Sequence, residues 1–112
     1  MANSRRIYRV AEQIRALIAT EVVKSQDSRL ELVTITSVRP TSDLREAKIY
    51  WSVHGGPERR VEVEQAFTEN EKTFRQKLAK QLTTRFAPKI RFYYDDTLDT
   101  IEEIDRLLGK IK

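Results

Sequence analysis

The sequence contains no cysteine, a single histidine, three glycines and three prolines. Without cysteine it can form neither a disulfide bond nor a thiolate metal site, which is typical of proteins from a reducing compartment. The scarcity of glycine and proline, together with 39% hydrophobic residues, argues against a disordered chain. No apolar run approaches the roughly 18 residues of a membrane-spanning helix, and the first residues lack the apolar stretch of a signal peptide. We therefore expect a cytoplasmic protein without a membrane partner, forming one domain over residues 1–112.

The residues that enzymes and metal sites require are also scarce. His54 stands beside two glycines, without the partner that a general base or a metal ion needs. The acidic segment 95–105 lacks the glycine and distal glutamate of a calcium loop, so we interpret it as helix caps and a surface that repels RNA. Neither a phosphate-binding loop nor a nucleophile motif is present. The sequence therefore predicts no catalytic residue, metal or cofactor, and a protein that is not an enzyme.

Hydrophobic periodicity and turn residues predict the order of the elements. The predicted elements are a helix over 4–24, a loop over 25–31, strands over 32–39 and 47–53, a helical region over 58–86, a strand over 90–94 and a helix over 98–109. This order is typical of an α+β fold with helices on one face of a three-stranded sheet, in which the first two strands form an antiparallel pair.

Three further expectations concern individual segments. The apolar line of the region 58–86 is interrupted at residues 70–73, so we expect a kink there, or two helices meeting. The final helix should turn its aliphatic side chains inward, namely Leu98, Ile101, Ile104 and Leu108. Strand alternation places Trp51 in the core and leaves Tyr50 and Tyr93 on the more exposed side, where stacking on bases is a weaker alternative to simple exposure.

Charge is distributed unevenly along the chain, whose net charge is +4. Segment 72–91 has no acidic residue and is rich in bases: Lys72, Arg75, Lys77, Lys80, Arg85, Lys89 and Arg91. Segment 92–105 has no base and is rich in acids: Asp95, Asp96, Asp99, Glu102, Glu103 and Asp105. Such asymmetry favours one surface for polyanions and another that repels them.

The basic residues group on two predicted helical surfaces. On a helical wheel Lys72 and Lys80 lie opposite Phe74, with Arg75 and Lys77 on the flanks. A second cluster stands at the start of the first helix, where the backbone already carries partial positive charge and cations do not stabilise it. The alternatives are an ordinary solvated helix face and a tolerated cluster at a fraying end. We predict RNA contacts for Arg5, Arg6, Arg9, Lys72, Arg75, Lys77, Lys80 and Arg85.

Six segments in this order and spacing resemble bacterial ribosome-binding factor A. The segments, found at residues 5–15, 27–30, 32–38, 42–50, 74–82 and 87–97, are RRIYRVAEQIR, DSRL, LVTITSV, SDLREAKIY, FRQKLAKQL and APKIRFYYDDT. The resemblance implies a KH-like fold of the second type, α-β-β-α-α-β with a C-terminal helix. It also implies binding to the small (30S) ribosomal subunit and its rRNA during late maturation, assistance to 16S rRNA 5′-end processing, and support of growth in the cold.

One segment departs from the family pattern. Where the family has a kink of the form Ala-x-Gly, this chain has Glu71-Lys72-Thr73, which favours a smoother bend because these residues lack the backbone freedom of glycine. A Gly-x-x-Gly loop is absent as well, so the ordinary KH clamp on four nucleotides is not expected. We expect a monomer that stabilises one rRNA arrangement. The alternatives are a sequence-reading single-stranded RNA module, a protein–protein adaptor that uses its basic face, and a nuclease that trims rRNA.

Overall fold

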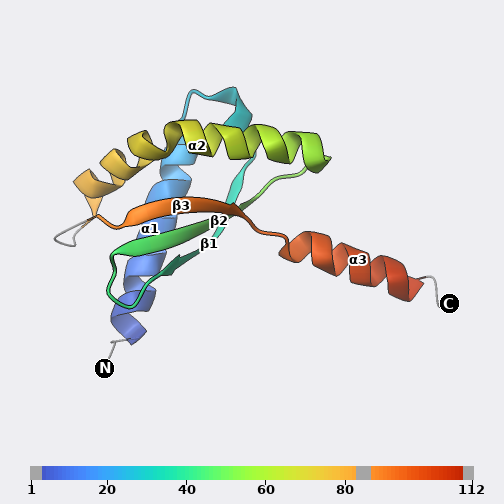
Figure 1. Ribbon diagram of the computed structural model, residues 1–112, viewed down its shortest axis with the longest axis horizontal. Helices are drawn as coiled ribbons and strands as arrows, with labels where there is room; N and C mark the ends of the chain where they lie inside the picture. The colour runs from blue at the N-terminus through green and yellow to red at the C-terminus, as the bar shows by residue number, and fades with distance from the viewer. Residues whose placement is uncertain (1–3, 83–86, 110–112) are drawn as a thin grey trace.

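The computed structural model describes residues 4–82 and 87–109 (Figure 1). Its elements, in chain order, are helix α1 (Ser4–Lys24), the short 3-10 helix η1 (Ser28–Leu30), strands β1 (Thr34–Pro40) and β2 (Glu46–Ser52), helix α2 (Gly56–Gln81), strand β3 (Lys89–Tyr94) and helix α3 (Thr97–Gly109). The predicted α+β class and the three predicted strands are confirmed, with boundaries within two residues.

The three strands form one mixed sheet in the order β1-β2-β3. β1 and β2 are antiparallel, as predicted, and the register shifts by a bulge between Ile35 and Ser37. β2 and β3 are parallel, because α2 carries the chain from the end of β2 back to the beginning of β3. Both strands therefore begin at the same end of the sheet, and the C-terminal end of α2 lies at that end as well (Figure 1).

Helices α1 and α2 cover one face of this sheet and enclose the core. α1 turns its apolar stripe toward β1, and α2 lies along β3. Trp51, Ile14 and Phe67 are fully buried, so the predicted core position of Trp51 is confirmed. The Phe67 ring is stacked on Phe92, with 4.2 Å between their centroids. The opposite face of the sheet is not covered by either helix.

Helix α2 is a single helix of 26 residues, so of the two alternatives expected at residues 70–73, a kink or two helices meeting, the second was wrong. It curves over the sheet without a break (Figure 1). Asn70 explains the interruption of the apolar line, because its side chain donates hydrogen bonds to the Ala66 carbonyl (2.8 Å) and to Asp27 Oδ2 (3.1 Å). Polar residues at this turn of α2 thus pack against the segment that follows α1, and they do not break the helix.

Helix α3 forms where the sequence predicts it, but its expected inward packing was wrong. It projects away from the sheet (Figure 1), and none of its residues is buried. Its aliphatic side chains are between 47% and 58% exposed: Leu98, Ile101, Ile104, Leu107 and Leu108. The periodicity correctly predicted an aliphatic stripe on α3, but no other element packs against that stripe in the described residues.

Candidate nucleic-acid interface

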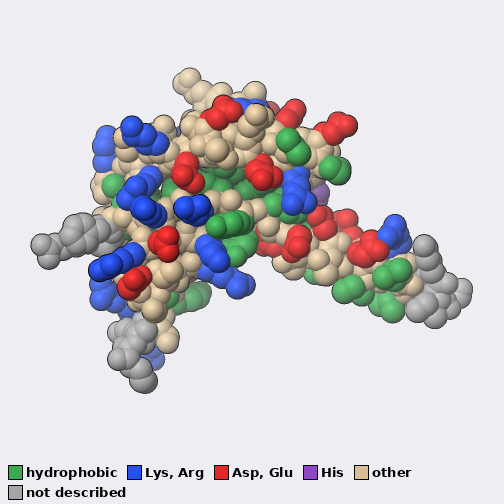
Figure 2. Space-filling view, viewed as in Figure 1, with side chains coloured by type: hydrophobic (Ala, Val, Ile, Leu, Met, Phe, Trp, Pro, Cys, Tyr) green, Lys and Arg blue, Asp and Glu red, His purple; other side chains and the backbone are tan. Residues whose placement is uncertain are grey.

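Positive charge gathers at one end of the molecule. In Figure 2, Lys and Arg side chains predominate around the C-terminal end of α2, over the strands and near the start of α1, whereas acids predominate over the beginning of α2 and along α3. The separation follows from the topology, because the basic half of α2 ends where β2 and β3 begin. The sequence asymmetry is therefore also an asymmetry in space.

The outer surface of the second half of α2 carries three exposed cations. Phe74 and Leu78 are buried beneath this surface, and Lys72, Arg75 and Lys80 point away from the core, as the helical wheel predicted. None of the three forms an ion pair with another residue of the segments 4–82 and 87–109. These side chains are free to replace the counterions condensed on a phosphate backbone.

Lys77 has a different role from its three neighbours. Its Nζ atom lies 3.2 Å from Glu21 Oε2 on α1, and Gln81 Nε2 donates to the other Glu21 oxygen at 3.1 Å. Burial alone would raise the pKa of Glu21, but the hydrogen bonds from Gln81 and Lys77, with the positive charge of Lys77, lower it overall. Lys77 is therefore largely neutralised by a carboxylate that is only 5% exposed. Arg85, the last predicted contact on this segment, lies outside the described residues.

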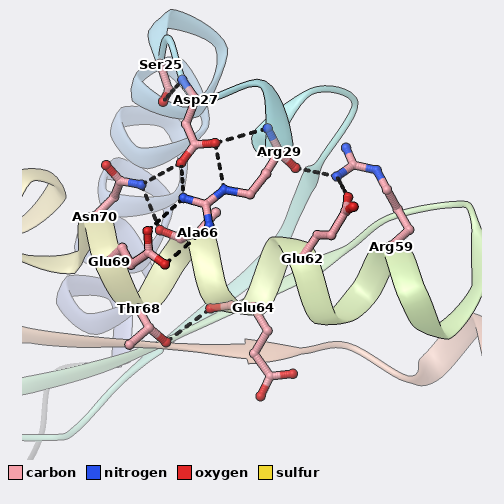
Figure 3. Close-up of polar contacts among 10 residues, drawn as sticks. All are labelled: Ser25, Asp27, Arg29, Arg59, Glu62, Glu64, Ala66, Thr68, Glu69 and Asn70. Atoms are coloured by element: carbon pink, nitrogen blue, oxygen red, sulfur yellow. Dashed lines mark hydrogen bonds and ion pairs between the residues drawn. The ribbon is translucent and has the colours of Figure 1, made fainter.

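A polar cluster fixes α2 relative to the chain that follows α1 (Figure 3). Arg29 forms ion pairs with Asp27 (2.7 Å) and with Glu69 of α2 (3.0 Å). The hydrogen bonds from the Arg29 side chain lower the pKa of Asp27 to about 2, despite the opposing effect of burial. Arg59 donates to the carbonyls of Arg29 and Glu31, at 2.5 Å in each case. These contacts fix the position of α2, and none of them involves Lys72, Arg75 or Lys80.

The arginines at the start of α1 form a separate set. Arg5, Arg6 and Arg9 are all exposed, and neither Arg5 nor Arg9 makes an ion pair within the described ranges. Sixteen residues separate Arg5 from Glu21, the α1 residue that contacts Lys77 and Gln81 of α2, so Arg5 lies about 24 Å along α1 from that contact. The two basic surfaces occupy the same end of the molecule (Figure 1) but do not merge into one helical patch.

The uncovered sheet face holds cations that the sequence analysis did not assign. Cross-strand register places Arg39, Lys48 and Arg91 side by side on β1, β2 and β3. Alternation along β2 places Lys48 and Tyr50 on the same face of the sheet. The row became visible only with the register between strands, because nothing local to one strand determines which residues lie opposite on the next.

The acidic end is organised by hydrogen bonds around the start of α3. Asp95 accepts from the hydroxyl of Thr36 (2.6 Å) and from Thr97, and these hydrogen bonds lower its pKa. Tyr94 donates its hydroxyl to Asp99 Oδ2 at 2.7 Å, which raises the pKa of Tyr94 to about 12. Asp95 thus satisfies the backbone N–H of Thr97, the first residue of α3, and holds the turn that leads into this helix.

No group of three His, Asp or Glu residues within residues 4–82 and 87–109 is arranged to hold a metal ion. Among the same residues, no helix has both the length and the apolar character that crossing a bilayer requires.

A family model described as ribosome-binding factor A matches residues 6–108. The chain belongs to the ribosome-binding factor A family. Two similar relatives are the ribosome-binding factor A of Geobacter sulfurreducens, 37% identical over 93% of this chain and 89% of the relative, and that of Desulfatibacillum aliphaticivorans, 34% identical over 92% and 81%. The family suggested by the six sequence segments is thus confirmed across nearly the whole chain.

Solved structures of ribosome-binding factor A have the same fold. The solution structure of a Thermotoga maritima relative is 33% identical, with a TM-score of 0.70 over 83% of this chain and 90% of that one. The crystal structure of the Thermus thermophilus protein is 23% identical, with a TM-score of 0.71 over 79% and 93%. A homology model of the Thermus protein, fitted into a cryo-EM map of a 30S complex, is 24% identical, with a TM-score of 0.64 over 76% and 90%. These similarities confirm the predicted fold class.

Proposed function

We propose that this protein binds the small ribosomal subunit and its rRNA in the cytoplasm during late maturation, as a monomer and without catalysing a reaction. Membership of a family named for ribosome binding supports the partner, as does the 30S complex formed by the Thermus protein. The observation that carries the proposal is the group Lys72, Arg75 and Lys80, exposed on one helix and unpaired with any carboxylate of the described segments.

The proposed mechanism is selection of one rRNA arrangement. Assembling rRNA samples several arrangements, and a protein that binds one of them more tightly shifts the population toward it by its difference in affinity. The basic surface on α2 and the arginines at the start of α1 are separate, which suits two backbone segments rather than one. Contacts of this kind recognise shape and phosphates more than sequence. By holding the subunit in this arrangement, the protein assists processing of the 16S rRNA 5′ end.

The test replaces the exposed cations of α2. The triple variant Lys72→Glu, Arg75→Glu and Lys80→Glu should abolish co-sedimentation with immature small subunits, while its melting temperature stays within a few degrees of wild type because all three side chains are exposed. Neutral Gln replacements should lower the slope of log affinity against log salt by about two to three, one unit for each lost phosphate contact. Primer extension on rRNA from cells with only the triple variant should show unprocessed 5′ ends.

A matched pair of variants separates a local effect from a change in net charge. Lys72→Glu/Lys80→Glu and Lys24→Glu/Arg106→Glu alter the charge equally, but only the first pair lies on the basic half of α2. We expect strong loss of subunit binding for the first pair and little change for the second. Equal losses in both pairs would leave only net charge as the cause, and unchanged binding by the triple variant would exclude this surface.

A further inference from the structure

The uncovered face of the sheet combines cations and aromatic rings in two adjacent rows. The first row is Arg39, Lys48 and Arg91, which are paired across the three strands. The second row lies two residues away along each strand and consists of Ser37, Tyr50 and Tyr93. α1 and α2 both pack on the other face, so these two rows are separate from the basic surface of α2.

The two tyrosines form an aromatic surface between the strands. Their ring centroids are 5.8 Å apart, and Tyr93 is 39% exposed whereas Tyr50 is half-buried. The Arg39 guanidinium lies 5.7 Å from the centre of the Tyr50 ring, and the Lys48 ammonium lies 5.8 Å from the centre of the Tyr93 ring. Positive charge is thus placed beside two tyrosine rings, of which Tyr93 is exposed, and single-strand binding surfaces combine cations and aromatic rings in this way for phosphates and bases.

Two carboxylates lie near these cations, Glu46 in the adjoining groove and Asp95, whose charge acts on Arg39. A groove of about 220 Å³ runs beside Tyr93, and its charged lining consists of Arg39, Lys48, Lys89 and Arg91 with only Glu46 opposing them. None of these four cations forms an ion pair with a residue in the described part of the chain. The groove therefore favours an anion, and the adjoining rings favour a planar group.

We propose that this sheet face binds a single-stranded segment of RNA, with phosphates along the row Arg39–Lys48–Arg91 and a base stacked on Tyr93. A duplex keeps its bases inside the helix, so only an unpaired strand can offer both a phosphate and a free base to such a surface. The Lys48 side chain can move from the ring to a phosphate when the base arrives, because its long stem is flexible. This inference rests on the proposed function, since it takes RNA as the partner, but it concerns a different surface.

The experiment measures fluorescence anisotropy of 5′-fluorescein-labelled ten-nucleotide oligouridylate and oligoadenylate, titrated with the full chain across a potassium chloride series. Tyr93→Ala should weaken binding about tenfold by removing the stacking surface, and Tyr93→Phe should leave it nearly unchanged because the ring remains. Lys48→Gln/Arg91→Gln should weaken binding by a similar factor and lower the salt slope by about 1.4, the value for two phosphate contacts on a single strand. The control Lys24→Gln/Arg106→Gln removes the same charge elsewhere and should bind as wild type.

The outcomes separate this inference from the proposed function. Wild-type protein that binds small subunits but not the oligonucleotides, or sheet variants that bind them as tightly as the control does, would overturn the sheet site and leave the proposed function intact. Wild-type protein that binds neither subunits nor RNA would overturn both. Urea denaturation of each variant, monitored by the fluorescence of Trp51, verifies that the core is intact.

Discussion

Helices α1 and α3 both carry an aliphatic stripe, yet only α1 buries it. On α1 the residues Ile14 and Ile18 are completely enclosed by the sheet and α2, whereas on α3 Ile101 and Ile104 remain about half exposed. An amphipathic pattern therefore determines which side of a helix is apolar, but the topology determines whether anything covers that side. α1 is part of the folding unit, and α3 is attached to it mainly by polar contacts near Tyr94 and Asp95.

The largest effect should come from truncating the α1 stripe. Ile14→Ala removes atoms from a site with no exposed surface, so we expect the free energy of unfolding to fall by about 3 kcal/mol. Urea denaturation followed by Trp51 fluorescence measures this change. A loss below about 1 kcal/mol would mean that α1 is no better packed than α3.

The polar attachment of α2 to the segment after α1 should have the next largest effect and a defined pH dependence. The pKa of Asp27 is about 2 in the folded protein, against 3.8 for the ordinary group, so its ionised form stabilises the fold. This stabilisation is fully present above about pH 4 and is lost as the pH falls toward 2. Asp27→Asn should cost about 2 kcal/mol at pH 7 and flatten the stability profile between pH 4 and 2. An unchanged profile would show that the contacts of Asp27 with Arg29 do not persist in solution.

Removal of α3 should affect stability less than the changes at Ile14 and Asp27. A chain ending at Asp96 loses the Tyr94–Asp99 hydrogen bond and no buried side chain, so we expect a cost of about 1 kcal/mol. Thermal denaturation by circular dichroism compares it with the full chain. A loss comparable to that of Ile14→Ala would indicate that the α3 stripe is covered in solution.

The smallest effect should come from the matched substitution on α3. Ile101→Ala makes the same chemical change as Ile14→Ala at a half-exposed position, so we expect less than about 0.5 kcal/mol. The same urea titration measures both variants, which makes the difference between them a direct measure of how unequally the two stripes are packed.

Local sequence pattern was sufficient for most of the fold. Steps of three and four placed Ile14 and Leu78 in the core, and strand alternation did the same for Trp51, because each depends only on neighbours along the chain. The polar interruption at residues 70–73 does not mark a break in α2, because Asn70 forms a hydrogen bond with Asp27, a residue distant in sequence. The predicted inward packing of α3 was wrong for the same reason, because no local signal shows whether another element covers the apolar side of a helix.

The candidate interface was predicted in part for similar reasons. The helical wheel correctly predicted that Lys72, Arg75 and Lys80 are exposed. It could not show that Lys77 pairs with Glu21 on another helix. It likewise gave no information on the row formed by Lys48 and Arg91, which exists only through strand pairing. Single elements thus indicated which side chains are exposed, whereas the charge of a surface depended on contacts between elements.

The opposite charges of the two ends have a consequence for the kinetics of association. A molecule with cations around the end of α2 and carboxylates along α3 has a permanent electric dipole along its length (Figure 2). In the field of a polyanion such a dipole rotates during diffusion, so that productive collisions become more frequent than random orientation would allow. If rRNA is the target, as proposed, the carboxylates of α3 increase the rate of association without touching it, and this effect diminishes as salt shortens the range of the field.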